Sequence, residues 1–347
     1  MSFHPDYYQI LAVLHNRRPE RLPLYEHNID PPFISKVIGR EICADGMSGA
    51  DLEEYYRTVT GFWREMTFDA FSYEAAICEI YPGHGAILGG MPGPIQTRGD
   101  FEKYPWKEVV EIFWRAYTPH LEAIRNTMPE GMKAYGGCGY GIFESSEDLV
   151  GFESLAVMQY LDPDLFADLF VRIGDLYVEL WSEMLRRYGD LFVFCRMGDD
   201  LGFKSSTLLE PDTIRNHILP QYKRVIDTVH GAGKKFLLHS CGCIFEVMED
   251  IIKLGIDAKH SNEDAIAPFE RWIELYGDRI GLFGGIDVNI LCLNSYDEVK
   301  RKVFEKGMIY RSMARGFGLG SGNSIAGYIP VEGFMGMVDA AKQIRIQ

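Results

Sequence analysis

The stretch Lys-Lys-Phe-Leu-Leu-His-Ser-Cys-Gly, residues 234–242, gives the clearest indication of how this chain folds. Its apolar run is too short for a helix and favours a short buried strand. The run ends at His239, and Cys241 and Cys243 follow at alternate positions. Because imidazole and thiolate groups bind zinc and related metals, the sequence predicts a buried strand that ends in metal ligands.

The chain contains eight short runs of this kind, each followed by a helical pattern. The predicted strands are residues 22–26, 68–73, 131–137, 191–196, 235–239, 256–260, 279–284 and 316–320. Strands that are buried on both faces and joined by helices form parallel sheets, and eight such units close a barrel. We therefore predict an α/β fold, a (β/α)8 TIM barrel. The competing doubly wound sheet usually has a glycine-rich turn after its first strand, whereas residues 27–32 contain no glycine.

A chain of 347 residues can form one large domain or two small ones. We expect a single barrel domain over residues 1–347, with an N-terminal helix within residues 1–20 and an insertion or lid loop at residues 75–105. Residues 80–99 hold six Gly and three Pro, a composition that favours a loop over a helix. Such a loop can cover a pocket.

The composition narrows the classes of partner. Fifty acidic residues against 35 basic ones give a formal charge of −15, which repels nucleic acids and anionic membranes. No apolar run reaches the roughly 18–20 residues that span a bilayer, and the first residues lack the basic flank and apolar core of a secretory signal. We expect a cytoplasmic protein. Seven cysteines at irregular spacing form no disulfide framework, so most should be buried thiols.

Polar residues at the ends of the predicted strands are candidate site residues, because the active sites of TIM barrels lie at the carboxyl ends of the strands. They are Glu26, His27, Glu74, Tyr140, Asp199, Asp200, His239, Cys241, Glu263, Asp287 and Asn323. Asp and Asn also cap helices, and for Asp287 this role is as plausible as chemistry.

His239 and Cys241 differ from the other candidates because side chains two positions apart on a strand point to the same side. The imidazole and the thiolate can then share one zinc ion at its preferred distances of ~2.0–2.3 Å. Glu263, at the end of the next predicted strand, is the predicted third ligand, with Cys243 in reserve. Three protein ligands and one open position describe a catalytic zinc site. The alternative is a buried histidine beside an inert thiol.

A catalytic zinc ion has a use in group transfer. Zinc lowers the pKa of a bound thiol, so that a thiolate can attack an electrophilic carbon near neutral pH. This is the chemistry of methyl transfer. Hydrolysis by zinc-bound water is a second option, although the sequence lacks the two helical His and the general-base Glu of many zinc hydrolases.

Three segments together resemble one protein family: Gly-Asp-Asp-Leu-Gly at 198–202, His-Ser-Cys-Gly at 239–242 and Phe-Gly-Gly-Ile-Asp at 283–287. From residue 151 onward, and more loosely before it, the chain resembles the uroporphyrinogen decarboxylase superfamily, in particular its cobamide-dependent methyltransferase branch. The zinc motif is also similar to that of cobalamin-independent methionine synthase. The resemblance implies a (β/α)8 fold, zinc held by His and Cys, and methyl transfer between a corrinoid protein and a thiol or other acceptor.

Two segments depart from the family pattern. Where such methyltransferases carry a further cysteine ligand, residues 320–324 read Gly-Ser-Gly-Asn-Ser, which leaves the fourth zinc position empty, held by Asn323, or reserved for substrate. Where the decarboxylases have an arginine-bearing loop that grips carboxylates, residues 24–28 read Leu-Tyr-Glu-His-Asn. An acidic loop repels a porphyrinogen. Asp199 or Asp200 nevertheless matches the substrate-binding aspartate of the decarboxylases, which keeps that alternative open.

We predict a zinc-dependent methyltransferase that moves a methyl group between a corrinoid protein, or a methylated substrate, and a thiol or similar acceptor. Its partners would be a small-molecule methyl donor or acceptor and a corrinoid-binding protein that docks at the strand ends, with no nucleic acid and no membrane. The oligomeric state is open, with a homodimer as one option. The alternatives are a carboxy-lyase acting on a tetrapyrrole and a non-catalytic barrel that binds a small molecule.

The predicted roles divide the site residues into two sets. The zinc ligands are His239, Cys241 and Glu263. The catalytic candidates are Asp199 or Asp200, which would orient the substrate or carry a proton, and the pocket residues Glu26, His27 and Tyr140.

Overall fold

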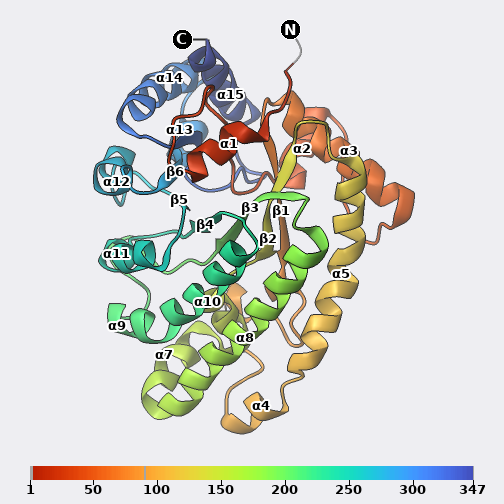
Figure 1. Ribbon diagram of the computed structural model, residues 1–347, viewed down its shortest axis with the longest axis vertical. Helices are drawn as coiled ribbons and strands as arrows, with labels where there is room; N and C mark the ends of the chain where they lie inside the picture. Colours follow the sequence, from red (N-terminus) through yellow and green to blue (C-terminus); the bar gives the residue numbers. More distant parts are fainter. Residues whose placement is uncertain (1–2, 90, 347) are drawn as a thin grey trace.

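The structure of the protein is a computed structural model that describes residues 3–89 and 91–346. Its centre is a parallel sheet of seven strands in which neighbours in sequence are neighbours in space (Figure 1). The strands are β1 Ala70–Ala76, β2 Lys133–Gly139, β3 Phe192–Gly198, β4 Phe236–His239, β5 Ala258–His260, β6 Gly281–Ile286 and β7 Phe317–Ser321. Because all pairings are parallel, the carboxyl ends of the strands lie at one edge of the sheet.

The last seven predicted strands are confirmed, and the first, residues 22–26, is present only as a single parallel bridge between Leu24 and Leu319. The N–H of Tyr25 donates to the carbonyl of Leu319 at 2.9 Å, and the N–H of Leu319 donates to the carbonyl of Pro23 at 3.0 Å. Pro23 itself has no N–H to donate, which limits the ladder on this side.

Aromatic side chains from distant strands meet inside the sheet. The ring of Phe194 on β3 lies 6.2 Å from that of Phe283 on β6. Tyr25 lies 4.7 Å from Phe283 and 5.1 Å from Tyr135 on β2. In a flat sheet β3 and β6 would be three strand spacings, about 14 Å, apart. The sheet is therefore curled around an aromatic core, in agreement with a TIM-barrel-like fold.

Helices surround the strands and form the connections between them (Figure 1). They are α1 Tyr7–Leu14, α2 Pro31–Ile38, α3 Gly49–Glu65, α4 Arg98–Lys103, α5 Trp106–Thr127, α6 Ile142–Val150, α7 Phe152–Leu161, α8 Pro163–Tyr188, α9 Pro211–Thr213, α10 Leu219–Gly231, α11 Phe245–Leu254, α12 Phe269–Tyr276, α13 Val288–Leu293, α14 Tyr296–Met313 and α15 Val331–Arg345, with short 3₁₀ turns at Ile77–Glu79 and Ala86–Leu88. Helix α8 begins with a proline, and the carboxylate of Asp162 caps it by accepting from the N–H of Leu165 at 2.9 Å. Within the described ranges, no helix combines the length and the apolarity needed to cross a membrane.

The glycine- and proline-rich segment after β1 packs against α6. The N–H groups of Gly93 and Ile95 donate to the carbonyls of Val150 and Leu149 at 3.1 and 2.9 Å. A Cβ at position 93 would lie 2.3 Å from the backbone of Leu149, so this approach requires glycine. The expected single domain with a lid loop over residues 75–105 stays a prediction.

Candidate functional site

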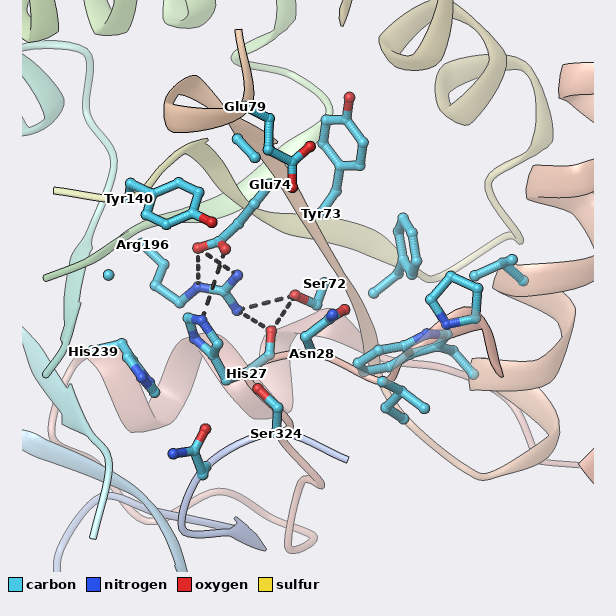
Figure 2. A pocket seen from close by; sticks show the side chains of 18 of the residues that line it. His27, Asn28, Ser72, Tyr73, Glu74, Glu79, Tyr140, Arg196, His239 and Ser324 are labelled. Carbon is cyan, nitrogen blue, oxygen red and sulfur yellow. Dashed lines mark hydrogen bonds and ion pairs between the residues drawn. The ribbon is translucent and has the colours of Figure 1, made fainter. Parts of the chain in front are cut away.

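A cavity of about 520 Å³ opens at the carboxyl ends of the first four strands (Figure 2). Its volume is typical of small-molecule sites. The polar lining includes Glu74 in β1, Arg196 in β3, Asp200 beyond it, His239 at the end of β4 and Asn323 after β7. This is the place at which a TIM barrel carries its active site.

Arg196 is fully buried and holds one wall of the cavity together. Its Nη2 lies 2.8 Å from Oε1 of Glu74. Its Nη1 donates to the backbone carbonyl of His27 at 2.6 Å and to Oγ of Ser72 at 3.0 Å. A buried charge is tolerated when it is paired and hydrogen-bonded, so Arg196 fixes the His27 segment against β1 and β3.

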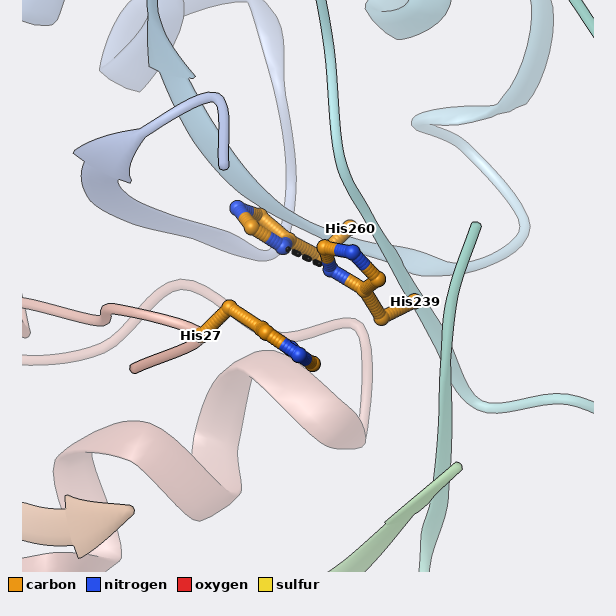
Figure 3. Close-up of side chains that lie close together, drawn as sticks. All are labelled: His27, His239 and His260. Atoms are coloured by element: carbon orange, nitrogen blue, oxygen red, sulfur yellow. Dashed lines mark hydrogen bonds between the residues drawn. The ribbon is translucent and has the colours of Figure 1, made fainter. Parts of the chain in front are cut away.

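Three histidines, His27, His239 and His260, lie together at the strand ends (Figure 3). Nε2 of His260 is 2.9 Å from the backbone oxygen of Ser321, and this nitrogen carries the proton because a carbonyl can only accept. Nδ1 of His260 is then an acceptor, and Nδ1 of His239 donates to it at 2.7 Å. Nε2 of His239 is then unprotonated, and its lone pair faces the thiol of Cys241 at 3.4 Å. These hydrogen bonds fix His239 in the tautomer that binds a metal through Nε2.

His27 stacks on His239 with ring centroids 3.6 Å apart, and its Nε2 lies 3.7 Å from Oε2 of Glu74. Its Nδ1 is buried without a hydrogen-bond partner among the described residues. Burial, and then the charge of Arg196, holds the pKa of His27 well below its usual value. The pKa of His239 is lowered in the same way, by burial first and then by His260. Both rings are therefore neutral near pH 7, as a histidine ligand must be.

Nε2 of His239 faces two further ligand atoms, Sγ of Cys241 at 3.4 Å and Oδ1 of Asp200 at 3.8 Å. Atoms that bind one tetrahedral zinc ion at ~2.0–2.3 Å lie about 3.5 Å from one another, so these separations fit zinc. The N–H of Cys241 donates to Oδ1 of Asp200 at 2.8 Å and orients the carboxylate. Asp200, His239 and Cys241, called the metal group below, therefore offer three ligand atoms of the types zinc prefers.

The three histidines form a second group of closely spaced ligand atoms. In that group the facing nitrogens, Nδ1 of His239 and Nδ1 of His260, are already joined by a hydrogen bond. A metal ion between the rings would have to replace this bond. The metal group needs no such change, and it is the better candidate for a metal site.

Glu263, the predicted third zinc ligand, belongs to neither group within the described residues, and Asp200 lies beside His239 and Cys241. Whether Glu263 binds zinc stays a prediction. Strand β5 ends at His260, and the chain then turns: the carbonyl of Glu263 accepts from the N–H of Ile266 at 3.0 Å. The turn is fixed by Asp287, whose Oδ2 accepts from the N–H of residue 264 at 2.7 Å. Asp287 therefore stabilises a turn, and its Oδ1 also caps α13.

The sulfur of Cys241 accepts hydrogen bonds from the other side. Nδ2 of Asn323 and Oγ of Ser261 both donate to Sγ at 3.4 Å. Burial, and then the charge of Asp200, raise the pKa of the Cys241 thiol, a shift that a bound cation would reverse. Cys243, the predicted reserve ligand, lies outside both groups of ligand atoms in the described ranges.

Of the two adjacent aspartates, only Asp200 lines the cavity. The buried carboxylate of Asp199 accepts from the N–H groups of Phe143 and Glu144 at 2.9 and 2.8 Å, and from the hydroxyl of Tyr222 at 2.7 Å. Burial raises its pKa to about 6, although these donors lower it. Asp199 thus anchors the start of α6 to β3, whereas Asp200 faces the cavity.

Glu26, a predicted pocket residue, lies behind the histidines and does not line the cavity. It is fully buried, and the N–H and hydroxyl of Ser321 donate to its two carboxylate oxygens. Burial raises the pKa of Glu26 to about 8, against the effect of these bonds. Because the carbonyl of Ser321 accepts from His260, Glu26 supports the hydrogen-bond chain that reaches His239.

Tyr140 lines the cavity, as predicted for a pocket residue, and its backbone has a φ of 60°. A bulky residue in this left-handed region is uncommon and is often found at functional sites.

Sequence reasoning did not single out Arg196 or His260. The sequence signal for Arg196 is a charged residue inside an otherwise apolar strand. For His260 it is a histidine at the end of the predicted strand 256–260, and only the structure shows that it pairs with His239.

Comparisons with known proteins identify a family and a protein of similar fold. The family model described as uroporphyrinogen decarboxylase (URO-D) matches residues 73–344. The chain is similar to a methyltransferase from Methanosarcina mazei, with 17% identity and a TM-score of 0.70 over 96% of this chain and 97% of that one. Weaker similarity exists to D-psicose 3-epimerase from Clostridium cellulolyticum H10 (11% identity, TM-score 0.39, 86% and 94% covered) and to the family 5 glycoside hydrolase PbGH5A from Prevotella bryantii B14 (9%, 0.48, 98% and 100%). No curated protein matches the sequence.

Proposed function

The chain belongs to the uroporphyrinogen decarboxylase family, and we propose that it is a zinc-dependent methyltransferase of that family. It would move a methyl group between a corrinoid protein, or a methylated substrate, and a thiol or similar acceptor. The fold shared with the methyltransferase from Methanosarcina mazei over nearly the whole chain supports the proposal.

The observation that carries the proposal is the metal group at the cavity wall. Nε2 of His239 is unprotonated and faces the metal group, because Nδ1 carries the proton and donates it in a hydrogen bond to His260. Cys241 and Asp200 lie 3.4 and 3.8 Å from that nitrogen. Since Asp200 and His239 also line the cavity, a small molecule in the cavity can reach the metal group.

Zinc, when bound, lowers the pKa of a coordinated thiol and so supplies a thiolate near neutral pH. In the transfer itself, an electron pair of the sulfur forms the new bond to the methyl carbon. The bond between that carbon and its donor breaks, the electron pair stays with the donor, and the thiol proton leaves to water. The residues around the site hold the reactants: His260 orients His239, and Arg196 keeps His27 and Glu74 in place.

A corrinoid held by a partner protein is the proposed methyl carrier. Because the methyl group must come within reach of the sulfur, the partner would dock over the edge of the sheet at which the cavity opens.

The charges in the cavity favour methyl transfer over decarboxylation of a porphyrinogen. Four carboxylates, Glu74, Glu79, Glu144 and Asp200, line the cavity. Among the described residues, Arg196 is the one arginine that lines the cavity, and it is already paired with Glu74 at 2.8 Å. A substrate with many carboxylates would meet repulsion there.

Metal analysis tests the proposal directly. Purified protein should hold about one zinc ion per chain, and the Cys241→Ala variant should lose it while Cys243→Ala, two residues away, keeps it. Circular dichroism establishes that both variants are folded. The zinc-loaded protein should also demethylate methylcobalamin in the presence of a thiol, which is visible as a change in corrinoid absorbance. Folded wild-type protein that takes up no zinc on titration would refute the proposal.

A further inference from the structure

Beyond the metal group, the cavity contains a second polar region formed by Glu79, Tyr117, Tyr140 and Glu144, called the acidic wall below. These residues come from separate parts of the chain: the 3₁₀ turn after β1, helix α5, the end of β2 and the first turn of α6. Figure 2 shows Glu79 and Tyr140 close to Glu74. The fold therefore gathers two carboxylates and two aromatic rings around one space.

The members of the acidic wall are close enough to influence one another. Burial, and then the charges of Cys78, Glu79 and Glu144, raise the pKa of the Tyr140 hydroxyl. Burial, followed by the charges of Glu79 and Tyr140, raises the pKa of Tyr117.

The acidic wall has little positive charge to balance it. Within the described residues, the carboxylates of Glu79 and Glu144 make no hydrogen bond or ion pair. Arg196, the arginine in the cavity lining, is engaged with Glu74 at 2.8 Å. The basic group that acts on Glu79 is His84, which is exposed to solvent. A cation in the cavity would supply the missing charge.

Tyr73 provides an independent sign that a ligand completes this space. Its side chain lines the same cavity, the residue is 8% exposed, and its hydroxyl has no hydrogen-bond partner among the described residues. A buried polar group without a partner is costly unless water or a ligand satisfies it. The hydroxyl oxygen can accept from an N–H donor such as an ammonium group.

We infer that the acceptor is a small thiol that carries a positive charge, with its sulfur at the metal group and its ammonium at the acidic wall. This inference rests on the proposed function, because it names the substrate class of the same site. Burial raises the pKa of Glu79 and, well above its usual value, that of Glu144. A bound ammonium would favour their ionised forms and be attracted by them. The faces of the two tyrosines bind cations within about 6 Å of their centroids. A thiol that carries a sulfonate or carboxylate would be repelled by the same groups.

The charge of such a substrate does not change during the reaction. The thiol loses a proton and gains a methyl group, and the product is a neutral thioether that still carries its ammonium. The acidic wall therefore holds substrate and product alike, and its role is to position the sulfur and to select the substrate.

Binding of three thiols of equal length tests the inference on the zinc-loaded protein. Cysteamine, 2-mercaptoethanol and 2-mercaptoethanesulfonate differ only in an ammonium, a hydroxyl or a sulfonate at the end remote from sulfur. Calorimetry should give the tightest binding for cysteamine and the weakest for the sulfonate, at least about tenfold apart. Equal affinities, or the reverse order, would overturn the inference.

Matched variants distinguish the effect of the acidic wall on thiol binding from the effect of each thiol's own pKa. Glu144→Gln should remove most of the preference for cysteamine and leave 2-mercaptoethanol unchanged, whereas Glu111→Gln, on the exposed side of α5, should keep it. Tyr117→Leu should weaken the preference, and Tyr117→Phe, which retains the ring, should preserve it. A preference that survives both Glu144→Gln and Tyr117→Leu contradicts the inference.

The S-methyl derivatives of the same three compounds distinguish a failure here from a failure of the proposed function. These thioethers have no acidic thiol, so their binding to the cavity can be measured with zinc-free protein. If the ammonium thioether shows no preference while zinc still binds, the charge of the substrate has been assigned wrongly. If the preference is present but no zinc binds, the inferred charge selection stands and the proposed function fails.

Discussion

Two adjacent carboxylates at the end of β3 have opposite surroundings. Asp199 is fully buried, and three donors occupy its oxygens. The side chain of Asp200 is 41% exposed, accepts from the N–H of Cys241 and lies 3.8 Å from Nε2 of His239. A carboxylate whose acceptor sites are filled by the protein stabilises the fold, whereas one that keeps free lone pairs in a cavity is available to a metal or a substrate. Of these two neighbours, Asp199 has a structural role, whereas Asp200 is available for binding.

The largest expected effect is on stability at Asp199. Asp199→Ala should lower the free energy of unfolding by about 3–5 kcal/mol, because it leaves the N–H groups at the start of α6 and the hydroxyl of Tyr222 without their buried acceptor. Urea denaturation followed by circular dichroism measures the change. Asp200→Ala is the matched control and should cost less than about 1 kcal/mol. Similar losses in both variants would break the comparison between the two carboxylates.

Asp200, whose loss should cost little stability, should matter for zinc affinity. Asp200→Asn should weaken zinc binding at least about 100-fold, because it removes a ligand, whereas Glu263→Gln should leave it unchanged. Competition with a chromophoric chelator measures both affinities on folded protein. A larger loss in Glu263→Gln would restore the ligand set predicted from the sequence.

The positions of the strand ends could be predicted from the sequence. Each apolar run is followed by a helical pattern, and the connections between the runs are too long for β-hairpins. The proximity of His239 and Cys241 was predicted from the two-residue period of a strand, although β4 ends at His239 and Cys241 lies in the segment after it. The place of Asp200 in the metal group did not follow from the sequence. Asp200 reaches the metal group because β3 and β4 pair with residue 198 opposite His239, and because the N–H of Cys241 holds its carboxylate. Pairing register between strands is a tertiary property that a single strand does not encode.

Glu26 shows a second limit of sequence reasoning. A glutamate at the end of a predicted strand suggested a pocket residue, but the segment pairs with β7 through only one bridge. Its carboxylate turns toward Ser321 and away from the cavity. Helix and strand periodicity predicts which face is apolar, and it does not predict which partner a buried polar side chain will find.

A third buried carboxyl, that of Glu26, extends the comparison. Burial raises the pKa of Glu26 to about 8, and among the described residues only Ser321 donates hydrogen bonds to it. Asp199 accepts from more donors, which limit the rise of the Asp199 pKa to about 6. The folded protein keeps the Glu26 proton up to about pH 8, whereas the unfolded chain releases it near its ordinary value of 4.5. The folded state therefore binds more protons in this window, and its stability falls as the pH rises. Between pH 6 and 8 this contribution amounts to about 2 kcal/mol.

Denaturation of wild type and Glu26→Gln at pH 6 and pH 8 measures this contribution. The variant cannot lose the proton, so its stability should fall less than that of the wild type over the same interval. Parallel curves would show that Glu26 is already ionised at pH 6 in the folded protein, and the contrast with Asp199 would then vanish.

The smallest expected effect concerns His260, which is outside the metal group but sets the tautomer of His239. His260→Phe keeps an aromatic ring beside Tyr25, 4.9 Å away, and removes the acceptor for Nδ1 of His239. Zinc affinity should fall about tenfold, the lower end of the range for residues that orient a metal ligand. His230→Gln, at an exposed histidine that pairs with Asp257, is the control and should bind zinc as the wild type does. An unchanged affinity in His260→Phe would mean that the hydrogen-bond chain from Ser321 does not orient His239, and that the ligand set must be reconsidered with all three histidines.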